Sequence, residues 1–118
     1  MRLDDWPEEY ELINFFEVLP EYLPLPGETN EKIGSTRFRL TENEVELVVT
    51  FDPWHDDVFL QLICDGKCHF DLVFFGALTQ IKISEFKTGP IMTLSVKSGA
   101  TVTISKVPQI AVEMRVTE

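Results

Sequence analysis

The stretch VFLQLICDGKCHFDLVFF, residues 58–75, most constrains how this chain can fold. Apolar and mixed positions alternate on both sides of Asp65-Gly66-Lys67, as expected for two strands of a hairpin that bury one face. The apolar positions are the even-numbered Val58, Leu60, Leu62, Cys64, Cys68, Phe70, Leu72 and Phe74. Placing both even-numbered sets on one face requires a loop with an odd number of residues. The sequence therefore predicts a central hairpin that organises the fold.

Two registers satisfy this requirement. In the first, Cys64 lies opposite Cys68; in the second, Gly66 occupies a bulge position and Ile63 pairs with Lys67. The freedom of glycine at positive φ favours the second register. A disulfide is therefore possible, but a reduced cysteine pair is the expectation. The C-x-x-x-C spacing matches neither a zinc knuckle nor a redox motif.

The odd-numbered face of the hairpin holds three polar residues inside an apolar frame. Gln61, His69 and Asp71 occupy this face, and either register brings Gln61 opposite one of the other two. These groups could line a small-ligand site beneath a helix. Buried polar groups are usually paired with one another, so mutual hydrogen bonding is the competing interpretation.

A helix is predicted at the amino terminus. Asp4-Asp5, an early proline and first-turn acids are typical of a helix start, and Pro20 is expected to end the helix. Leu12, Phe15, Phe16 and Leu19 recur at helical spacing, and Trp6, Tyr10 and Ile13 widen the apolar stripe. Such a helix can lie on a sheet. The proline-rich segment 20–34 is expected to be an extended or turn-rich connection and not regular structure.

From residue 35 onward the period changes to two, which is typical of strands. A two-residue turn at Glu42-Asn43 would place Leu40 opposite Val45 and Arg39 opposite Glu46. Four further alternating segments follow the central hairpin, at 79–86, 91–97, 101–107 and 109–117. The expected fold is a single α+β domain over residues 1–118, mainly β. Its N-terminal helix packs on a strongly bent antiparallel meander, or barrel-like sheet, of about eight strands.

Charge is distributed unevenly along the chain. Residues 1–65 hold sixteen acids and four basic residues, a net charge of −12, whereas residues 66–118 have a net charge of +2. A strongly acidic surface repels nucleic acid and anionic lipid and attracts basic protein surfaces. No signal peptide or membrane-spanning run is evident, so a cytoplasmic location is expected.

The acids suggest where a basic protein partner could bind. The predicted partner-binding residues are Asp52, Trp54, His55, Asp56, Asp57, Glu42, Glu44 and Glu46. The segment 52–57 also has the residue types of a divalent-cation site, but it lacks the pattern of a calcium-binding loop. Asp and Pro commonly serve to turn the chain, so no metal site is predicted. Trp54 could be an aromatic anchor for the partner or a core residue.

No catalytic pattern is present. The sequence lacks a phosphate loop, a dinucleotide fingerprint and the basic, aromatic stripe of single-strand binders. Cys68 and His69 are adjacent on a strand and point to opposite faces, which argues against a nucleophile–base pair. A non-enzymatic protein without a cofactor is therefore expected.

The order of elements, and especially LVFFGALTQIKIS followed by short alternating strands, resembles small cytosolic immunity proteins of bacterial polymorphic toxin systems. The resemblance spans residues 35–118 and implies a protein that neutralises a cognate toxin, often a basic nuclease, through acidic surfaces. Two other functions stay open. One is small-ligand binding between helix and sheet at Gln61, His69 and Asp71. The other is a structural or homo-oligomeric role, in which surplus apolar strand faces become subunit contacts.

Overall fold

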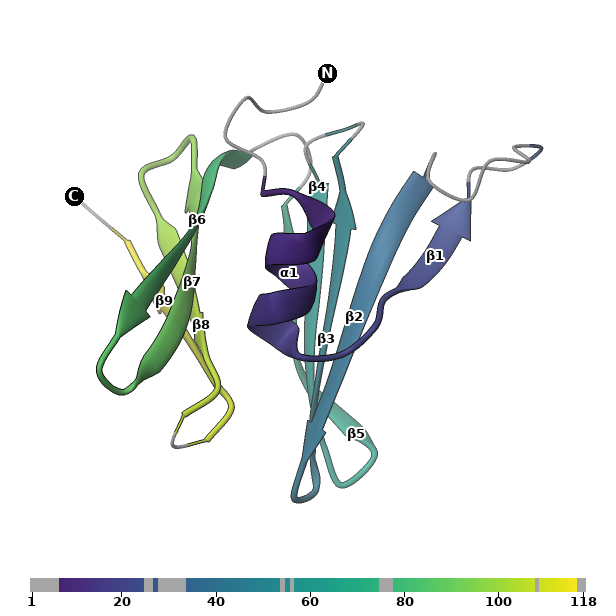
Figure 1. Ribbon diagram of the computed structural model, residues 1–118, viewed down its shortest axis with the longest axis vertical. Helices are drawn as coiled ribbons and strands as arrows, with labels where there is room; N and C mark the ends of the chain where they lie inside the picture. The colour runs from purple at the N-terminus through teal and green to yellow at the C-terminus, as the bar shows by residue number, and fades with distance from the viewer. Residues whose placement is uncertain are drawn as a thin grey trace.

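The computed structural model describes residues 7–24, 27, 34–53, 55, 57–74, 78–107 and 109–116, with the backbone alone at 68–70 and 74. One helix, α1 (Glu9–Phe16), precedes two antiparallel sheets in this part of the chain (Figure 1). Sheet A contains β1 (Glu21–Pro24), β2 (Gly34–Glu42), β3 (Val45–Asp52), β4 (Asp57–Cys64) and β5 (Lys67–Phe74), in that order. Sheet B contains β6 (Leu78–Phe86), β7 (Gly89–Val96), β8 (Thr101–Ser105) and β9 (Ala111–Arg115), also in order. The α+β, mainly β meander with an N-terminal helix is confirmed.

Two features of the sheets differ from the expected arrangement. The meander divides into two sheets, because β5 and β6 follow each other in sequence without pairing. The segment 20–34 also contains β1, which pairs with β2 at the edge of sheet A. Prolines at positions 20 and 24 bound this strand, and an edge strand tolerates proline because its outward N–H groups need no ladder partner. The expectation of an irregular segment was wrong for Glu21–Pro24.

The β2–β3 hairpin has its turn one residue later than predicted. Asn43-Glu44 form the two-residue turn, and Glu42 pairs with Val45. Asn43 has a φ of 49°, a left-handed conformation that asparagine tolerates better than most residues. The shift changes the predicted pairs by two positions, so Leu40 faces Leu47. Because a shift of two keeps the side-chain alternation, the predicted faces are unchanged.

The central hairpin combines a short turn with a bulge. Asp65 and Gly66 form a two-residue turn with φ values of 53° and 76°, as in the type I′ turns that suit twisted hairpins. Cys64 therefore pairs with Lys67, not with Cys68, and carries a free thiol. Placing the even-numbered residues of both strands on one face requires one extra residue in the hairpin. This residue lies within the strands, at the register shift between Leu62 and Ile63, and not in the loop as predicted.

Beyond this bulge the even-numbered positions of the two strands pair with each other, as in the first predicted register. Val58 pairs with Phe74, Leu60 with Leu72, and Leu62 with Phe70.

The helix is shorter than its apolar stripe suggests. It ends at Phe16, and Glu17 follows in the left-handed conformation with a φ of 60°. Leu19 lies beyond the helix and is 81% exposed, so its predicted place on the buried face was wrong. Tyr10 is exposed too, while Leu12 is buried. The predicted capping acids at positions 4 and 5 lie outside the described residues.

A single apolar core joins the helix to both sheets. Phe16 stacks on Phe38 of β2 with 4.8 Å between ring centroids, and Phe15 meets Phe16 edge-on at 5.0 Å. Fully buried residues of β7 and β8, including Met92 and Ile104, belong to the same core. In Figure 1, α1 lies in the opening between the two sheets. Each sheet thus buries one face and leaves the other available for binding.

Polar contacts fasten α1 at both ends. Near its start, the Tyr22 hydroxyl of β1 donates a hydrogen bond to the Glu9 carboxylate. Near its end, Lys106 lies 3.1 Å from a Glu17 oxygen and 5.3 Å from the centre of the Phe15 ring. The Lys106 side chain is only 9% exposed, so its ammonium group is held against the helix end, where cations are favoured.

Candidate functional site

The side chains of sheet A alternate between two faces, and five of the predicted site residues lie on one of them. Phe38, Val49 and Leu60 are neighbours across the ladder and are fully buried against the core. The opposite side of these strands is called here the outer face of sheet A. It comprises Glu21, Leu23, Ser35, Arg37, Arg39, Thr41, Glu46, Val48, Thr50, Asp52, Asp57, Phe59, Gln61, Ile63, Asp71 and Val73. Carboxylates outnumber guanidinium groups among these residues, so the face is acidic.

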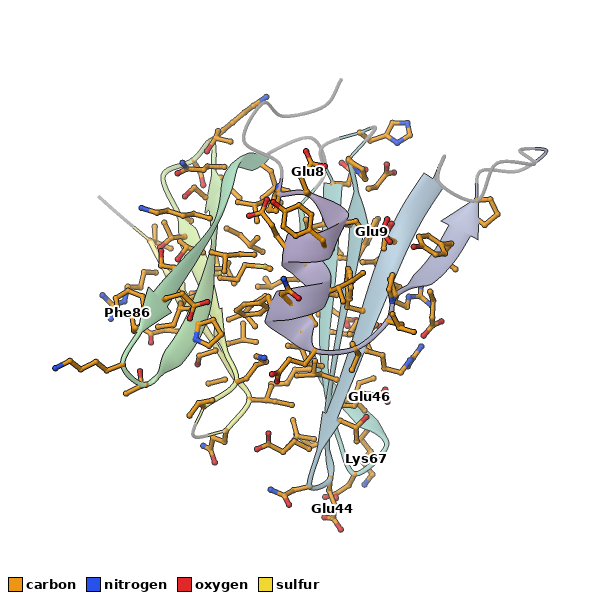
Figure 2. All side chains as sticks on the ribbon, viewed as in Figure 1. Glu8, Glu9, Glu44, Glu46, Lys67 and Phe86 are labelled. Atoms are coloured by element: carbon orange, nitrogen blue, oxygen red, sulfur yellow. The ribbon has the colours of Figure 1, made fainter. Side chains whose placement is uncertain are left out.

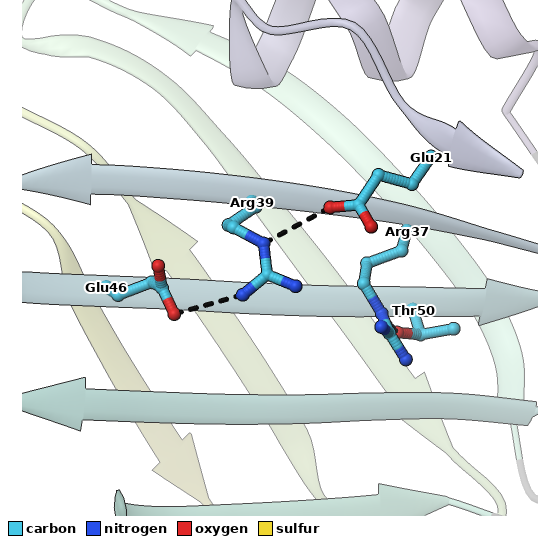
Figure 3. Close-up of polar contacts among 5 residues, drawn as sticks. All are labelled: Glu21, Arg37, Arg39, Glu46 and Thr50. Carbon is cyan, nitrogen blue, oxygen red and sulfur yellow. Dashed lines mark hydrogen bonds and ion pairs between the residues drawn. The ribbon is translucent and has the colours of Figure 1, made fainter. Parts of the chain in front are cut away.

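Arg39 connects three strands on the outer face. Its Nε lies 3.2 Å from an oxygen of Glu21 on β1, and its Nη1 lies 3.1 Å from an oxygen of Glu46 on β3 (Figure 3). The hydrogen bond with Glu21 is the main cause that raises the pKa of Arg39 above its ordinary value. The predicted Arg39–Glu46 contact is therefore present, although the two residues are not directly opposite.

Replacing Arg39 with methionine is expected to lower the free energy of unfolding by about 1 kcal/mol or less, because exposed ion pairs contribute little. The Arg39 side chain is 42% exposed, so water screens both contacts. Urea unfolding followed by circular dichroism measures the change. Arg115→Met on sheet B, which removes an ion pair at a 78% exposed side chain, is the matched control. A loss above about 2 kcal/mol for Arg39→Met alone would contradict a surface role.

The central strand of the outer face is covered by its neighbours. Val48 and Thr50 are only 3% and 6% exposed, although they face away from the core. Arg39 lies across the ladder from Val48, and Arg37 lies across from Thr50. The aliphatic parts of arginine side chains pack on apolar surface while their charged ends stay in water. The Arg37 Nε also donates a hydrogen bond to Thr50 Oγ1 at 3.1 Å (Figure 3). The arginine side chains of β2 therefore cover the outward-facing residues of β3.

One end of sheet A gathers acids from two hairpin turns. The Asp65 N–H donates a hydrogen bond to the Glu44 carbonyl oxygen at 3.0 Å, which joins the β2–β3 turn to the β4–β5 turn. Figure 2 shows Glu44 and Glu46 at this end, with Lys67 nearby. The acidic end of sheet A is defined here by Glu42, Glu44, Glu46 and Asp65. Because a backbone hydrogen bond links the turns, the four acids lie at one end of the sheet.

The opposite end of sheet A holds the second predicted group. Asp52 and Asp57 pair across the ladder, and His55 Nδ1 lies 2.7 Å from Asp52 Oδ2. One ligand atom from each of these three residues lies within 4.8 Å of the others, so they have the donors to hold a divalent cation. Trp54 and Asp56, also predicted, lie outside the described residues.

The predicted partner-binding acids therefore form two groups and not one. They are separated by the length of β3, which has eight residues and spans roughly 25 Å at 3.3 Å per residue. A single flat partner surface could reach both ends only by crossing the outer face of sheet A. Glu46, Asp52 and Asp57 share that face. The outer face thus links the two groups.

A pocket of about 380 Å³ opens on the outer face. Gln61 and Asp71 pair across β4 and β5, and both line it. The other described lining residues are Leu23, Ser35, Arg37, Thr50, Phe59, Leu60, Leu72 and Val73. The predicted position of this pocket, between helix and sheet, was wrong. Phenylalanine side chains fill that interface, and the pocket lies on the opposite side of the sheet. The third predicted residue, His69, is described in its backbone only.

Sequence reasoning missed several residues of this surface. Glu21 was assigned to an irregular segment, and Asp65 was treated only as a turn residue. The sequence predicts a partner for Arg39 in Glu46 but assigns no role to Arg37. The alternation of residues 35–42 did place both arginines on the polar face, which was the available signal. Their different partners depend on β1, which the sequence did not predict.

No family model and no curated protein matches this chain. The fold matches a chain of a solved structure described as a contact-dependent growth inhibition toxin–immunity protein complex from Klebsiella pneumoniae 342. The likeness has a TM-score of 0.80 and covers 99% of this chain and 100% of the other, at 14% sequence identity. No helix in the described residues is long and apolar enough to cross a membrane. The resemblance expected from the sequence therefore has a counterpart in the fold.

Proposed function

We propose that this chain is a cytoplasmic, non-enzymatic immunity protein that binds a basic toxin through the acids of sheet A. The observation that carries the proposal is the full-length likeness to a chain of a toxin–immunity protein complex. The acidic outer face and the acidic end of sheet A supply the complementary charge. The predicted residues Glu42, Glu44, Glu46, Asp52 and Asp57 lie at the two ends of this surface, where a toxin could contact both.

Of the two kinds of protein in such a complex, the features of this chain favour the inhibitor. The sequence has no nucleophile motif and no phosphate loop. Its strong negative charge would repel nucleic acid, which is the substrate of a nuclease toxin. An inhibitor needs only a stable scaffold with a complementary surface. The packed core and polar outer face provide that arrangement.

The test begins with a tagged copy of the chain, captured from the source cells together with any bound protein. The captured protein, identified by mass spectrometry, is then expressed in a host with and without this chain. The expected result is growth arrest by the captured protein alone and normal growth when both are present. Growth arrest by this chain alone would show that it is the toxin. Growth that stays arrested when both are present would refute the immunity role.

The rate of association with the captured toxin is expected to fall by about tenfold or more between about 50 mM and 500 mM NaCl, because salt screens the attraction between opposite charges. The dissociation rate should change less, since it depends on the contacts already formed. Stopped-flow measurements at several salt concentrations give both rates. An association rate independent of salt would mean that the acidic surface does not guide binding.

A second candidate function is small-molecule binding in the outer-face pocket. Its volume of about 380 Å³ is within the range of ligand sites, and Gln61 and Asp71 provide polar groups. Native mass spectrometry of the purified protein would reveal a retained ligand. The expected mass for the immunity role is that of the chain alone, whereas an added stoichiometric mass would support this second function.

A further inference from the structure

The two arginines on the outer face of β2 differ in their ionic partners. Arg39 forms ion pairs with both Glu21 and Glu46. Arg37, two residues earlier on the same face, forms no ion pair with any described residue, and its Nε hydrogen bonds to the neutral hydroxyl of Thr50. Figure 3 shows this contrast directly. Among the three arginines in the described part of the chain, Arg39 and Arg115 form ion pairs and Arg37 does not.

Arg37 also lines the outer-face pocket, whereas Arg39 does not. The pocket combines this guanidinium with the hydroxyl groups of Ser35 and Thr50, the apolar side chains of Leu23 and Phe59, and the polar pair Gln61 and Asp71 described above. With Nε engaged by Thr50, the two terminal nitrogens of Arg37 keep their donor capacity. A guanidinium with free terminal donors binds carboxylates through two parallel hydrogen bonds. Arg37 therefore gives the pocket one group that can pair with a carboxylate on a short apolar stem, against the negative charge of Asp71.

We infer that the pocket receives an aspartate or glutamate side chain of the bound toxin, and that Arg37 is the residue that recognises it. The inference rests on the proposed function. It adds one contact in which this chain provides the positive charge and the toxin the negative charge. A basic surface meeting an acidic one can slide among many positions of similar energy. A single acid on the toxin that pairs only with Arg37 fixes the orientation, because every neighbouring acid on the outer face repels it. Arg37 is thus a specificity residue within an otherwise acidic surface.

The test compares Arg37→Gln with Arg39→Gln in binding to the captured toxin by titration calorimetry. Arg37→Gln is expected to weaken binding by about 30-fold or more, as for loss of one partner of a buried, hydrogen-bonded charge pair. Arg39→Gln, on the same face, should weaken it by less than about fivefold, because its guanidinium is already paired within the chain. Arg37→Lys keeps the positive charge but not the paired donors of the guanidinium, so it should give an intermediate loss of affinity. Thermal unfolding verifies that each variant folds. If Arg37→Gln does not fold, Arg37→Lys serves as the test.

A charge exchange identifies the occupant of the pocket. Each aspartate and glutamate of the toxin is replaced in turn with arginine and tested against Arg37→Glu, and one of these toxin variants is expected to restore most of the lost affinity. If none restores it, a toxin carboxylate does not occupy the pocket. If Arg37→Gln binds the toxin as tightly as the unmodified chain, the inference is wrong although the proposed function stands. If the unmodified chain binds no toxin, the proposed function itself fails.

Discussion

Replacing Phe16 with alanine is expected to lower the free energy of unfolding by about 3–5 kcal/mol, the usual cost of removing a buried aromatic side chain. Phe16 is 2% exposed, stacks on Phe38 and lies 6.2 Å from the ring centre of Phe51. It therefore joins α1 to sheet A at the centre of the core. A domain of this size is usually stable by about 5–15 kcal/mol, so the loss would be a large fraction of the total.

Urea unfolding followed by circular dichroism measures this change, with Phe86→Ala as the matched control. Phe86 lies at the end of β6, is 56% exposed and appears at the surface of sheet B in Figure 2. Its replacement should change the stability by about 0.5 kcal/mol or less, as for most surface positions. Equal effects of the two substitutions would contradict the position of Phe16 between helix and sheet.

Reversing two charges at the acidic end of sheet A is expected to slow association with the proposed toxin partner by about tenfold or more at low salt. Glu42→Lys and Glu44→Lys together change the net charge by four units at this end. Neither glutamate forms an ion pair with another described residue, so the substitutions should leave the fold intact. Stopped-flow association measures the rate, and the difference from the unmodified chain should shrink at high salt.

The control for this prediction carries the same net charge at another place. Glu85→Lys with Glu113→Lys changes two exposed acids on sheet B. If the toxin responds to the local surface, this variant should associate faster than the sheet A variant. Equal rates for the two variants would show that only the total charge matters, and the acidic end would then have no particular role in binding.

The parts of the fold that follow from side-chain alternation were predictable. The apolar residues of β3 and β4, such as Val49 and Leu60, lie on the buried face as expected. Turn positions were less predictable, because a shift of two residues leaves the alternation unchanged. The division into two sheets was not predictable either, since alternating strands read the same whether or not consecutive strands pair. The early end of α1 depends on Glu17, whose left-handed conformation has no clear signal in the sequence.

The candidate site was predictable only in its composition. Pairing of Gln61 with Asp71 followed from one of the two registers considered, and their place on the odd-numbered face was correct. The apolar even-numbered face already indicated on which side of the sheet the core lies, so placing the polar group beneath the helix did not follow from the alternation. The contrast between Arg37 and Arg39 was also hidden. It arises from Glu21 on β1, which is close to Arg39 only in the folded chain.

The alternation of sheet A also bears on how proteins of this fold can diverge. Residues that face the core and residues that face outward occupy alternate positions of the same strands, so either set can change while the other is kept. Substitutions on the outer face could therefore change what this surface binds without passing through unfolded intermediates. The 14% identity found beside a TM-score of 0.80 is the outcome that such a separation allows.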